Sequence, residues 1–183
     1  MGLLLVRPKL TASEAGHYTR GREREGMAVR SEPRVLIRDA TAEVLGTVLR
    51  VEEASFPTPW SRAAFVAELS HQRSCFRVAV LDPLSADDAA GFIVTWLVHD
   101  EAHVLKIAVD ERYRRRGVAT ALLEDSLAAM AGRGARAAYL EVRETNRGAI
   151  AFYEKRRFDP IGRRQRYYAD TGEDALVLCR TLP

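Results

Sequence analysis

Glu141 could do chemistry because it interrupts the otherwise apolar run AAYLEVR. If this run is a strand, alternation places Tyr139, Glu141 and Arg143 on one face. Leu140 and Val142 then lie on the other face. A carboxylate in such surroundings must be ion-paired, reached by water, or readier than usual to take up a proton. Two interpretations stay open: an ion pair with Arg143 or another arginine, and a general base that removes a proton from a substrate.

Asn146 and Tyr153 follow this run and lie seven positions apart, on about the same side of an expected helix. One interpretation is a helix N-cap followed by a tyrosine of the core. The other is a phenol that gives its proton to a leaving group, for which an ordinary tyrosine pKa near 10 is suitable. In that case a base and an acid come from neighbouring elements.

The cluster Arg114, Arg115, Arg116 and Gly117 suits the binding of phosphate groups. It follows an expected strand and precedes an expected helix, whose first N–H groups and positive dipole end would face an anion. Glycine allows close approach of the backbone, and the small Ala119 keeps that approach uncrowded. The pattern is neither a P-loop nor a G-x-G-x-x-G dinucleotide motif. The loop alone fits a solvated surface turn equally well.

Hydrophobic periodicity predicts the elements that must position these residues. The expected strands are 35–38, 75–81, 91–98, 104–109, 137–142 and 175–182, the last of which closes the sheet. The helix after the basic loop should bury one face, formed by Ala119, Leu122, Leu123, Ser126, Leu127 and Met130. Two parallel strands joined through this helix form a βαβ unit. A polar turn at residues 99–102 should lead into the strand before the loop.

Two further helices are expected upstream, with N-caps at Thr41 and Ser61. Their apolar positions are Val44, Leu45, Val48 and Val51 in the first and Phe65, Val66 and Leu69 in the second. Between them the run SFPTPWS contains two prolines and places Phe56 and Trp60 in a loop. These aromatic rings either pack the loop onto the core or form an apolar wall for a substrate.

Composition limits the remaining possibilities. The 183 residues suit one domain, which we place at 34–183 after a polar extension, 1–33, that should be largely disordered. Met27 is an alternative start. The charge of +3 does not indicate nucleic-acid binding, and no apolar run approaches the ~20 residues of a membrane span. The two cysteines lack metal-site spacing, so we expect a cytoplasmic protein without metal.

The motifs resemble those of a known enzyme family. Arg114-x-x-Gly117-x-Ala119 is similar to the acetyl-coenzyme A signature of the GNAT acetyltransferases. The runs LEVRETNRGAIAFYEKRRF, SFPTPWS and RRQRYY and the closing Glu173-Asp174-Ala175 resemble the RimI-type ribosomal-protein alanine N-acetyltransferases within that family. The resemblance extends from about Phe56 to Leu178.

The resemblance implies an α/β GNAT fold, with a mixed, mostly antiparallel sheet whose central strands splay to admit the pantetheine arm of acetyl-coenzyme A. It makes Glu141 the general base and Tyr153 the general acid. The residues implied in cofactor binding are Ile107, Ala108, Val109, Arg114, Arg115, Arg116, Gly117, Val118, Ala119, Thr120, Asn146 and Tyr153. The residues expected to contact the acceptor are Phe56, Trp60, Tyr139, Arg143, Tyr167 and Tyr168.

The implied reaction moves acetyl from acetyl-coenzyme A to the α-amino group of a protein N-terminus, typically the N-terminal alanine of a small-subunit ribosomal protein. Acetylation of a lysine or a small-molecule amine is an alternative, and a non-catalytic module that binds acyl-coenzyme A is another. Arg157 departs from the family pattern, which has glycine before the phenylalanine. Glycine suits a helix C-cap with positive φ, a conformation that costs arginine about 1 kcal/mol.

Overall fold

The computed structural model describes residues 35–81 and 88–183, so the expected extension 1–33 and the start at Met27 lie outside it. The strands are β1 Val35–Asp39, β2 Ser74–Leu81, β3 Ala89–Val98, β4 Glu101–Val109, β5 Ala137–Arg143, β6 Asp159–Tyr168 and β7 Glu173–Thr181. The helices are α1 Leu45–Ser55, α2 Arg62–Ser70, α3 Val118–Gly132 and α4 Arg147–Glu154, with a 3-10 turn, η1, at Glu111–Tyr113. None of the described helices is long and apolar enough to cross a membrane.

The strands form one sheet in the order β1-β2-β3-β4-β5-β7-β6. Neighbouring strands are antiparallel except β4 and β5, which are parallel and joined through α3. The expected mixed, mostly antiparallel sheet is therefore confirmed. The expectation that the last strand closes the sheet is wrong: β7 lies between β5 and β6, and β6 is the edge, because β6 folds back on β7 as a hairpin.

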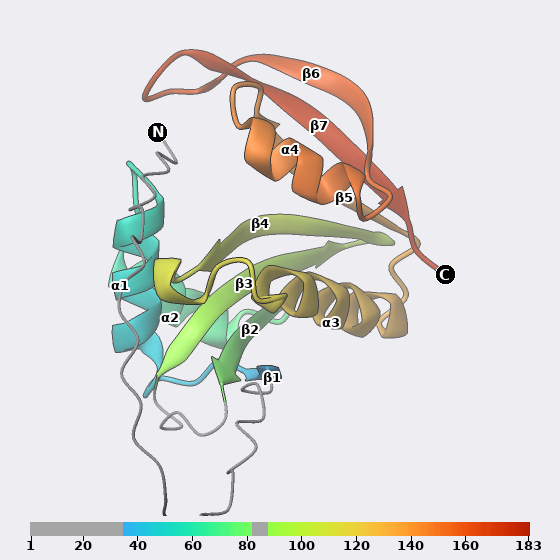
Figure 1. The fold of residues 1–183 in the computed structure, drawn as a ribbon. Coiled ribbons are helices and arrows are strands. Elements are labelled where there is room, and N and C mark those ends of the chain that lie inside the picture. The colour runs from blue at the N-terminus through green and yellow to red at the C-terminus, as the bar shows by residue number, and fades with distance from the viewer. Residues whose placement is uncertain (1–34, 82–87) are drawn as a thin grey trace, which may run out of the picture. The chain divides into compact units, whose positions relative to one another are not determined.

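The central parallel pair diverges soon after it begins. Among the described residues, β4 and β5 are paired from Glu101 to His103 on β4, opposite Ala137 to Tyr139 on β5. β4 then continues to Val109 while pairing with β3 alone, and β5 continues while pairing with β7. Figure 1 shows the two strands separating, with α3 below and α4 above the divergence.

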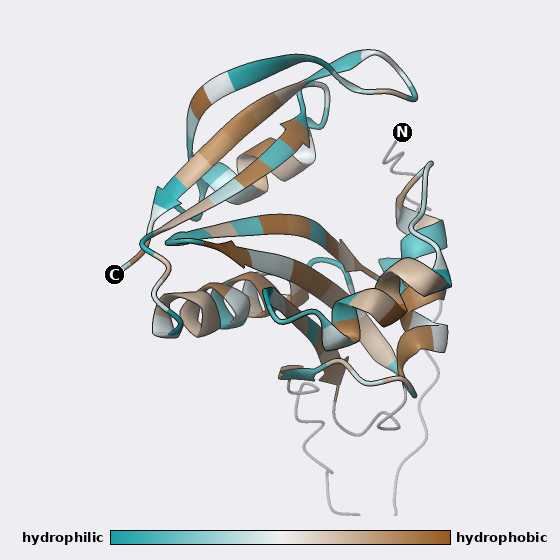
Figure 2. Ribbon diagram, turned by 180° about the vertical axis from the view of Figure 1, so that it is seen from behind, coloured by the Kyte–Doolittle hydropathy of each residue, from teal (hydrophilic) through white to brown (hydrophobic). Residues whose placement is uncertain are grey.

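Two apolar cores cover opposite faces of the sheet. On one face α3 packs on the central strands, with Leu122, Leu123 and Met130 fully buried, and the same core continues to Ile150 and Tyr153 of α4. On the other face α1 and α2 form a second core whose members include Val44, Leu45, Val48, Val51, Phe65, Phe76 and Phe92. Figure 2 shows the apolar residues concentrated on the central strands and β6 largely hydrophilic.

The expected caps are confirmed at Ser61, which accepts a hydrogen bond from the backbone N–H of Ala64, but not at Thr41. Residues 42–44 form a turn, and α1 begins at Leu45 without a side-chain cap. Of the apolar positions expected in α2, Phe65 is fully buried, whereas the side chain of Val66 is about half exposed. The turn into β4 is shorter than residues 99–102, because β4 already begins at Glu101.

Candidate active site

The start of α3 presents uncapped backbone donors. Gly117 is the N-cap residue with φ 79° and contributes no side-chain cap. The first backbone bond of the helix runs from Ala121 N to Gly117 O at 2.9 Å, so the N–H groups of Val118, Ala119 and Thr120 have no helical partner. The side chain of Val118 is buried in the core, so a ligand could contact this residue through its backbone N–H alone.

The preceding arginines keep their charge available. Arg112 forms an ion pair with Asp110 at 2.7 Å, whereas within the described residues Arg114, Arg115 and Arg116 have no acidic partner. Arg114 Nε donates instead to the carbonyl of Val109 at 3.1 Å, which fixes the loop against the end of β4. Uncapped N–H groups and unneutralised guanidinium groups together fit a ligand that carries several phosphates.

The divergence leaves the edge of β4 open beside this loop. Ile107, Ala108 and Val109 pair with β3 on one side and, among the described residues, with no strand on the side of β5. Alternate N–H and C=O groups of a strand point to each edge, so the open edge offers hydrogen bonds to an extended ligand. The pantetheine arm expected from the sequence has this character.

Glu141 lies on the side of β5 turned away from the core that contains Leu140 and Val142, as alternation predicts. Its carboxylate is 22% exposed and forms an ion pair with Arg164 of β6 at 3.1 Å. The pair expected as one interpretation therefore exists, with Arg164 in place of Arg143. Because Arg164 is 57% exposed, this pair contributes little to stability and is open to exchange with water or a ligand.

Tyr153 of α4 is buried between the rings of Phe152 and Phe158, at centroid distances of 5.1 and 5.5 Å. Burial, and secondarily the nearby Tyr168, raise the pKa of Tyr153 above its ordinary value. The phenol thus keeps its proton at neutral pH, as a proton donor must. Asn146 caps α4, its Oδ1 accepting from Ala149 N at 3.1 Å, which leaves its amide N–H groups for a ligand.

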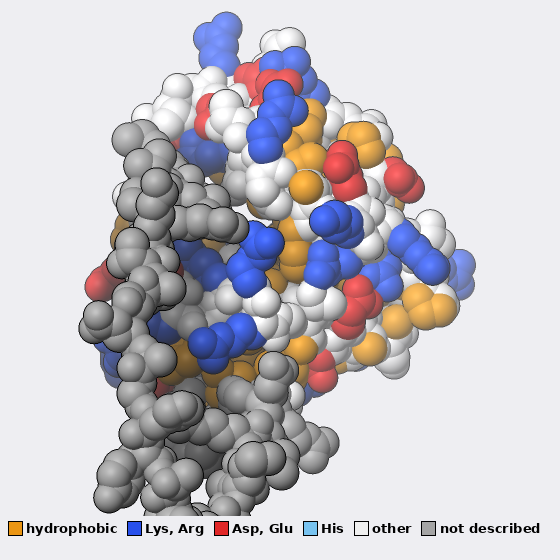
Figure 3. Space-filling model, in the orientation of Figure 1, with side chains coloured by type: hydrophobic (Ala, Val, Ile, Leu, Met, Phe, Trp, Pro, Cys, Tyr) orange, Lys and Arg blue, Asp and Glu red, His pale blue; other side chains and the backbone are white. Residues whose placement is uncertain are grey.

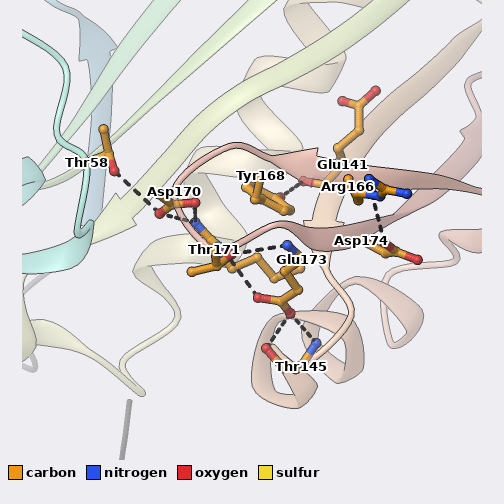
Figure 4. A network of polar contacts seen from close by, with 10 residues as sticks. Thr58, Glu141, Thr145, Arg166, Tyr168, Asp170, Thr171, Glu173 and Asp174 are labelled. Carbon is orange, nitrogen blue, oxygen red and sulfur yellow. Dashed lines mark hydrogen bonds and ion pairs between the residues drawn. The ribbon is translucent and has the colours of Figure 1, made fainter.

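Tyr168 connects Glu141 to the end of β6. Its hydroxyl donates to the backbone carbonyl of Glu141 at 3.4 Å (Figure 4). The guanidinium of Arg143 lies over its ring, 3.9 Å from the centroid. Burial raises the pKa of Tyr168 to about 12. The neighbouring Tyr167 is 47% exposed. Tyr139 lies at the last position of β5 that pairs with β4, with its ring stacked on His103 at a centroid distance of 5.6 Å, and so marks where the divergence begins.

Arg143 is bound within the protein. Its guanidinium donates to both carboxylate oxygens of Asp170, at 2.8 and 2.7 Å, and to Thr171 Oγ1 at 2.7 Å, and it approaches Glu173 at 3.3 Å. Hydrogen bonding to Arg143 lowers the pKa of Asp170. This network shapes the turn between β6 and β7 (Figure 4), and contact of Arg143 with an acceptor stays a prediction.

The turn between β6 and β7 also reaches the loop between α1 and α2. Thr58, in the loop between α1 and α2, donates its hydroxyl to Asp170 Oδ2, in the turn between β6 and β7, at 3.4 Å (Figure 4). The two segments expected to contact the acceptor are therefore joined by a hydrogen bond.

A buried ion pair that the sequence analysis did not identify supports Phe56 and Trp60. Glu52 of α1 is fully buried, and its Oε1 accepts from Lys106 Nζ at 2.5 Å and from the Trp60 backbone N–H at 2.7 Å. Lys106 Nζ also lies 3.7 Å from the centre of the Phe56 ring. Glu52 Oε2 has no hydrogen-bond partner among the described residues. Phe56 and Trp60 also pack against the core of α1 and α2, as the first interpretation expects, and their contact with an acceptor stays a prediction.

The sequence contains a signal for this pair. Glu52 falls on the apolar stripe of α1 with Val48 and Val51, and Lys106 interrupts the apolar run VLKIAV. Opposite charges at two positions expected to be buried indicate partners.

Arg157 adopts the conformation that favours glycine. Its φ is 63°, its N–H donates to Glu154 O at 3.0 Å, and Phe158 N donates to Tyr153 O at 3.2 Å. The turn after α4 therefore keeps its positive φ with an arginine in place, and Tyr153 stays in the core.

Comparison with known proteins adds a family and relatives. Residues 45–158 match the model of the "Acetyltransferase (GNAT) family". A putative ribosomal protein bS18-alanine N-acetyltransferase of Bacillus subtilis is 30% identical over 146 residues, covering 80% of this chain and 95% of the relative. An N-alpha-acetyltransferase of Saccharolobus solfataricus is 35% identical over 160 residues, covering 80% and 92%. The crystal structure of the Escherichia coli ribosomal-protein-S18-alanine N-acetyltransferase superposes with a TM-score of 0.71 at 31% identity, covering 81% and 94%.

Proposed function

The chain belongs to the GNAT acetyltransferase family, whose members use acetyl-coenzyme A, and we propose that it acetylates the α-amino group of protein N-termini. We assign the activity to residues 34–183 and a cytoplasmic location to the protein. The acceptor we favour is the N-terminal alanine of a small-subunit ribosomal protein, because relatives from Bacillus subtilis and Escherichia coli are named ribosomal protein bS18-alanine N-acetyltransferases.

The observation that carries this proposal is the divergence of β4 and β5. Glu141 lies on β5 at this divergence, and the buried Tyr153 lies on α4, the helix that follows β5. The start of α3 and its arginines would hold the phosphates of acetyl-coenzyme A, and the open edge of β4 would hold the pantetheine arm. Acetyl-coenzyme A supplies an activated acetyl group as a thioester. An acceptor would approach from the face that carries Glu141 and the tyrosines of β6.

These positions support the following proton transfers. The amine nitrogen of the acceptor forms a bond to the acetyl carbon, and Glu141 takes up the proton that the amine loses, directly or through water. The bond between the acetyl carbon and sulfur breaks, and Tyr153 protonates the departing thiolate. Backbone N–H groups of β4 stabilise the negative charge that develops on the carbonyl oxygen. Orientation of the amine against the thioester supplies a large further part of the rate.

The test is the release of coenzyme A from acetyl-coenzyme A with peptides that differ in their first residue, each also supplied with a blocked N-terminus and an internal lysine. Turnover confined to free N-termini, best with alanine first, is the expected result. Turnover on blocked peptides would assign the activity to lysine instead. Cofactor binding without turnover on any peptide would leave a small-molecule acceptor or a non-catalytic binding module.

Two variants test the assigned roles. Glu141→Gln and Tyr153→Phe should each lower kcat by a factor on the order of 100, the usual contribution of general acid–base catalysis, with little change in coenzyme A affinity. Glu154→Gln, an exposed position on α4, is the matched control and should keep full activity. Unchanged turnover in Glu141→Gln would refute its role as base.

A further inference from the structure

Arg156 links the two helices that flank the divergence of β4 and β5. It follows α4, and its guanidinium lies over the Phe152 ring at 3.8 Å, with Nη1 donating to the carbonyl of Phe152 at 2.6 Å. Nη2 donates to the hydroxyl of Thr120 in the first turn of α3. Its Nε is buried without a hydrogen-bond partner among the described residues. The side chain therefore extends from α4 to the amino-terminal end of α3.

This position is electrostatically unfavourable for a cation on its own. The amino-terminal end of α3 carries the positive end of the helix dipole, which repels positive charge. Arg114, Arg115 and Arg116 precede the same turn, and in the described part of the chain neither they nor Arg156 form an ion pair with an acid. Figure 3 shows Lys and Arg side chains gathered over this face, between α4 and α3. A polyanion would remove the repulsion.

We propose that Arg156 is a phosphate-binding residue for the acetyl donor and that its guanidinium turns from the Thr120 hydroxyl to a phosphate of coenzyme A on binding. Arg156 then holds the donor from the side of α4, while the arginine loop and α3 hold it from the side of β4. The Phe152 carbonyl and ring keep the guanidinium oriented in both states. The inference rests on the proposed function, because it needs coenzyme A as the ligand.

The experiment measures the dissociation constants of coenzyme A and of dephospho-coenzyme A, which lacks the ribose phosphate, by calorimetry on the full chain. Arg156→Leu should bind coenzyme A about tenfold more weakly, a loss of about 1.4 kcal/mol, as expected for a hydrogen-bonded charge pair. The same loss with dephospho-coenzyme A would identify the diphosphate as the group bound. A loss that disappears with dephospho-coenzyme A would identify the ribose phosphate.

A donor without phosphates separates phosphate binding from a structural role. With S-acetylpantetheine, Arg156→Leu should keep the kcat/KM of the parent protein, since no phosphate is present to be bound. Arg156→Lys, which retains the charge, should recover most of the affinity for coenzyme A. Equal losses of kcat/KM with acetyl-coenzyme A and with S-acetylpantetheine would show that Arg156 merely supports α4, and would overturn the inference.

Arg136→Leu is the control for net charge. Arg136 is exposed and lies beyond the carboxyl end of α3, a 15-residue helix about 22 Å long, so its loss should leave the affinity unchanged. Unchanged affinity of Arg156→Leu for coenzyme A would refute the inference about Arg156 and leave the proposed function standing. Failure of the parent protein to bind coenzyme A would refute the proposed function as well.

Discussion

Replacing Lys106 by Met removes the ammonium group that contacts the buried carboxylate of Glu52. Met has a similar length and volume, so the change removes charge and leaves the packing of β4 against α1 nearly intact. Glu52 has no exposed surface, and its Oε2 already lacks a partner among the described residues. The substitution therefore leaves a buried carboxylate that keeps just the Trp60 N–H bond.

The expected loss of unfolding free energy is about 3–5 kcal/mol, the usual result of removing one partner of a buried ion pair. Glu52→Gln should cost less, about 1.5–3 kcal/mol, because the Lys106 side chain is 11% exposed and can turn its ammonium toward water. In the double variant neither charge remains. Its loss should fall about 2–3 kcal/mol short of the sum of the single losses.

Equilibrium unfolding in urea at neutral pH measures these differences, and the exposed Lys155→Met serves as the matched control, with an expected change within about 0.5 kcal/mol. Lys106 also contacts the Phe56 ring, so the same variants should raise the KM of a peptide acceptor while leaving the dissociation constant of coenzyme A unchanged. Additive losses in the double variant would show that Glu52 and Lys106 do not interact energetically and would refute this reasoning.

Three further predictions concern α4 and the acceptor side. Arg157→Gly should raise the free energy of unfolding in urea by about 1 kcal/mol, because φ is 63° there, whereas Arg157→Ala should bring no such gain. The raised pKa of Tyr153 means that the folded state keeps a proton which the unfolded state loses above pH 10, so this stabilisation is complete below that pH and is lost as pH rises further. We therefore expect the stability of Tyr153→Phe, measured by urea unfolding, to decline less steeply between about pH 9 and 11 than that of the parent protein. This range surrounds the ordinary tyrosine pKa of about 10. Thr58→Val removes the bond to Asp170 and should raise the acceptor KM by less than about threefold in coenzyme A release assays, with the melting temperature unchanged.

Each of these has a contrary outcome. Equal stability of the glycine and arginine forms at position 157 would mean that the positive φ carries no strain. Parallel alkaline declines with and without the Tyr153 hydroxyl would show that burial does not hold its proton. A large rise in the KM for acetyl-coenzyme A after Thr58→Val would place that loop beside the donor.

Local signals predicted the parts of the site that depend on neighbouring residues. Ser61 and Asn146 were recognisable as caps because a side-chain oxygen three residues before a free N–H is a local arrangement. The same rule failed at Thr41, where a turn intervenes before α1. Alternation along β5 placed Glu141 on the correct face because the neighbouring apolar residues fix that face.

Partners that meet through the fold could not be predicted in this way. Arg143 and Arg164 are both arginines near acidic residues, yet Arg164 binds Glu141 and Arg143 binds Asp170. This choice depends on how the hairpin of β6 and β7 docks beside β5, which no local pattern encodes. The position of β7 inside the sheet has the same origin.

The short pairing of β4 with β5 also has a mechanical consequence. Within the described residues, the two parts of the sheet are joined along three backbone positions, from Glu101 to His103. Beyond this seam the two parts are held together by side chains: the core that α3 shares with α4, the contact of Arg156 with Thr120, and the Thr58–Asp170 hydrogen bond. A donor that contacts both sides would add a further link between them and hold the angle at which the acceptor surface forms. Donor and acceptor should then bind cooperatively, each raising the affinity for the other by the same factor.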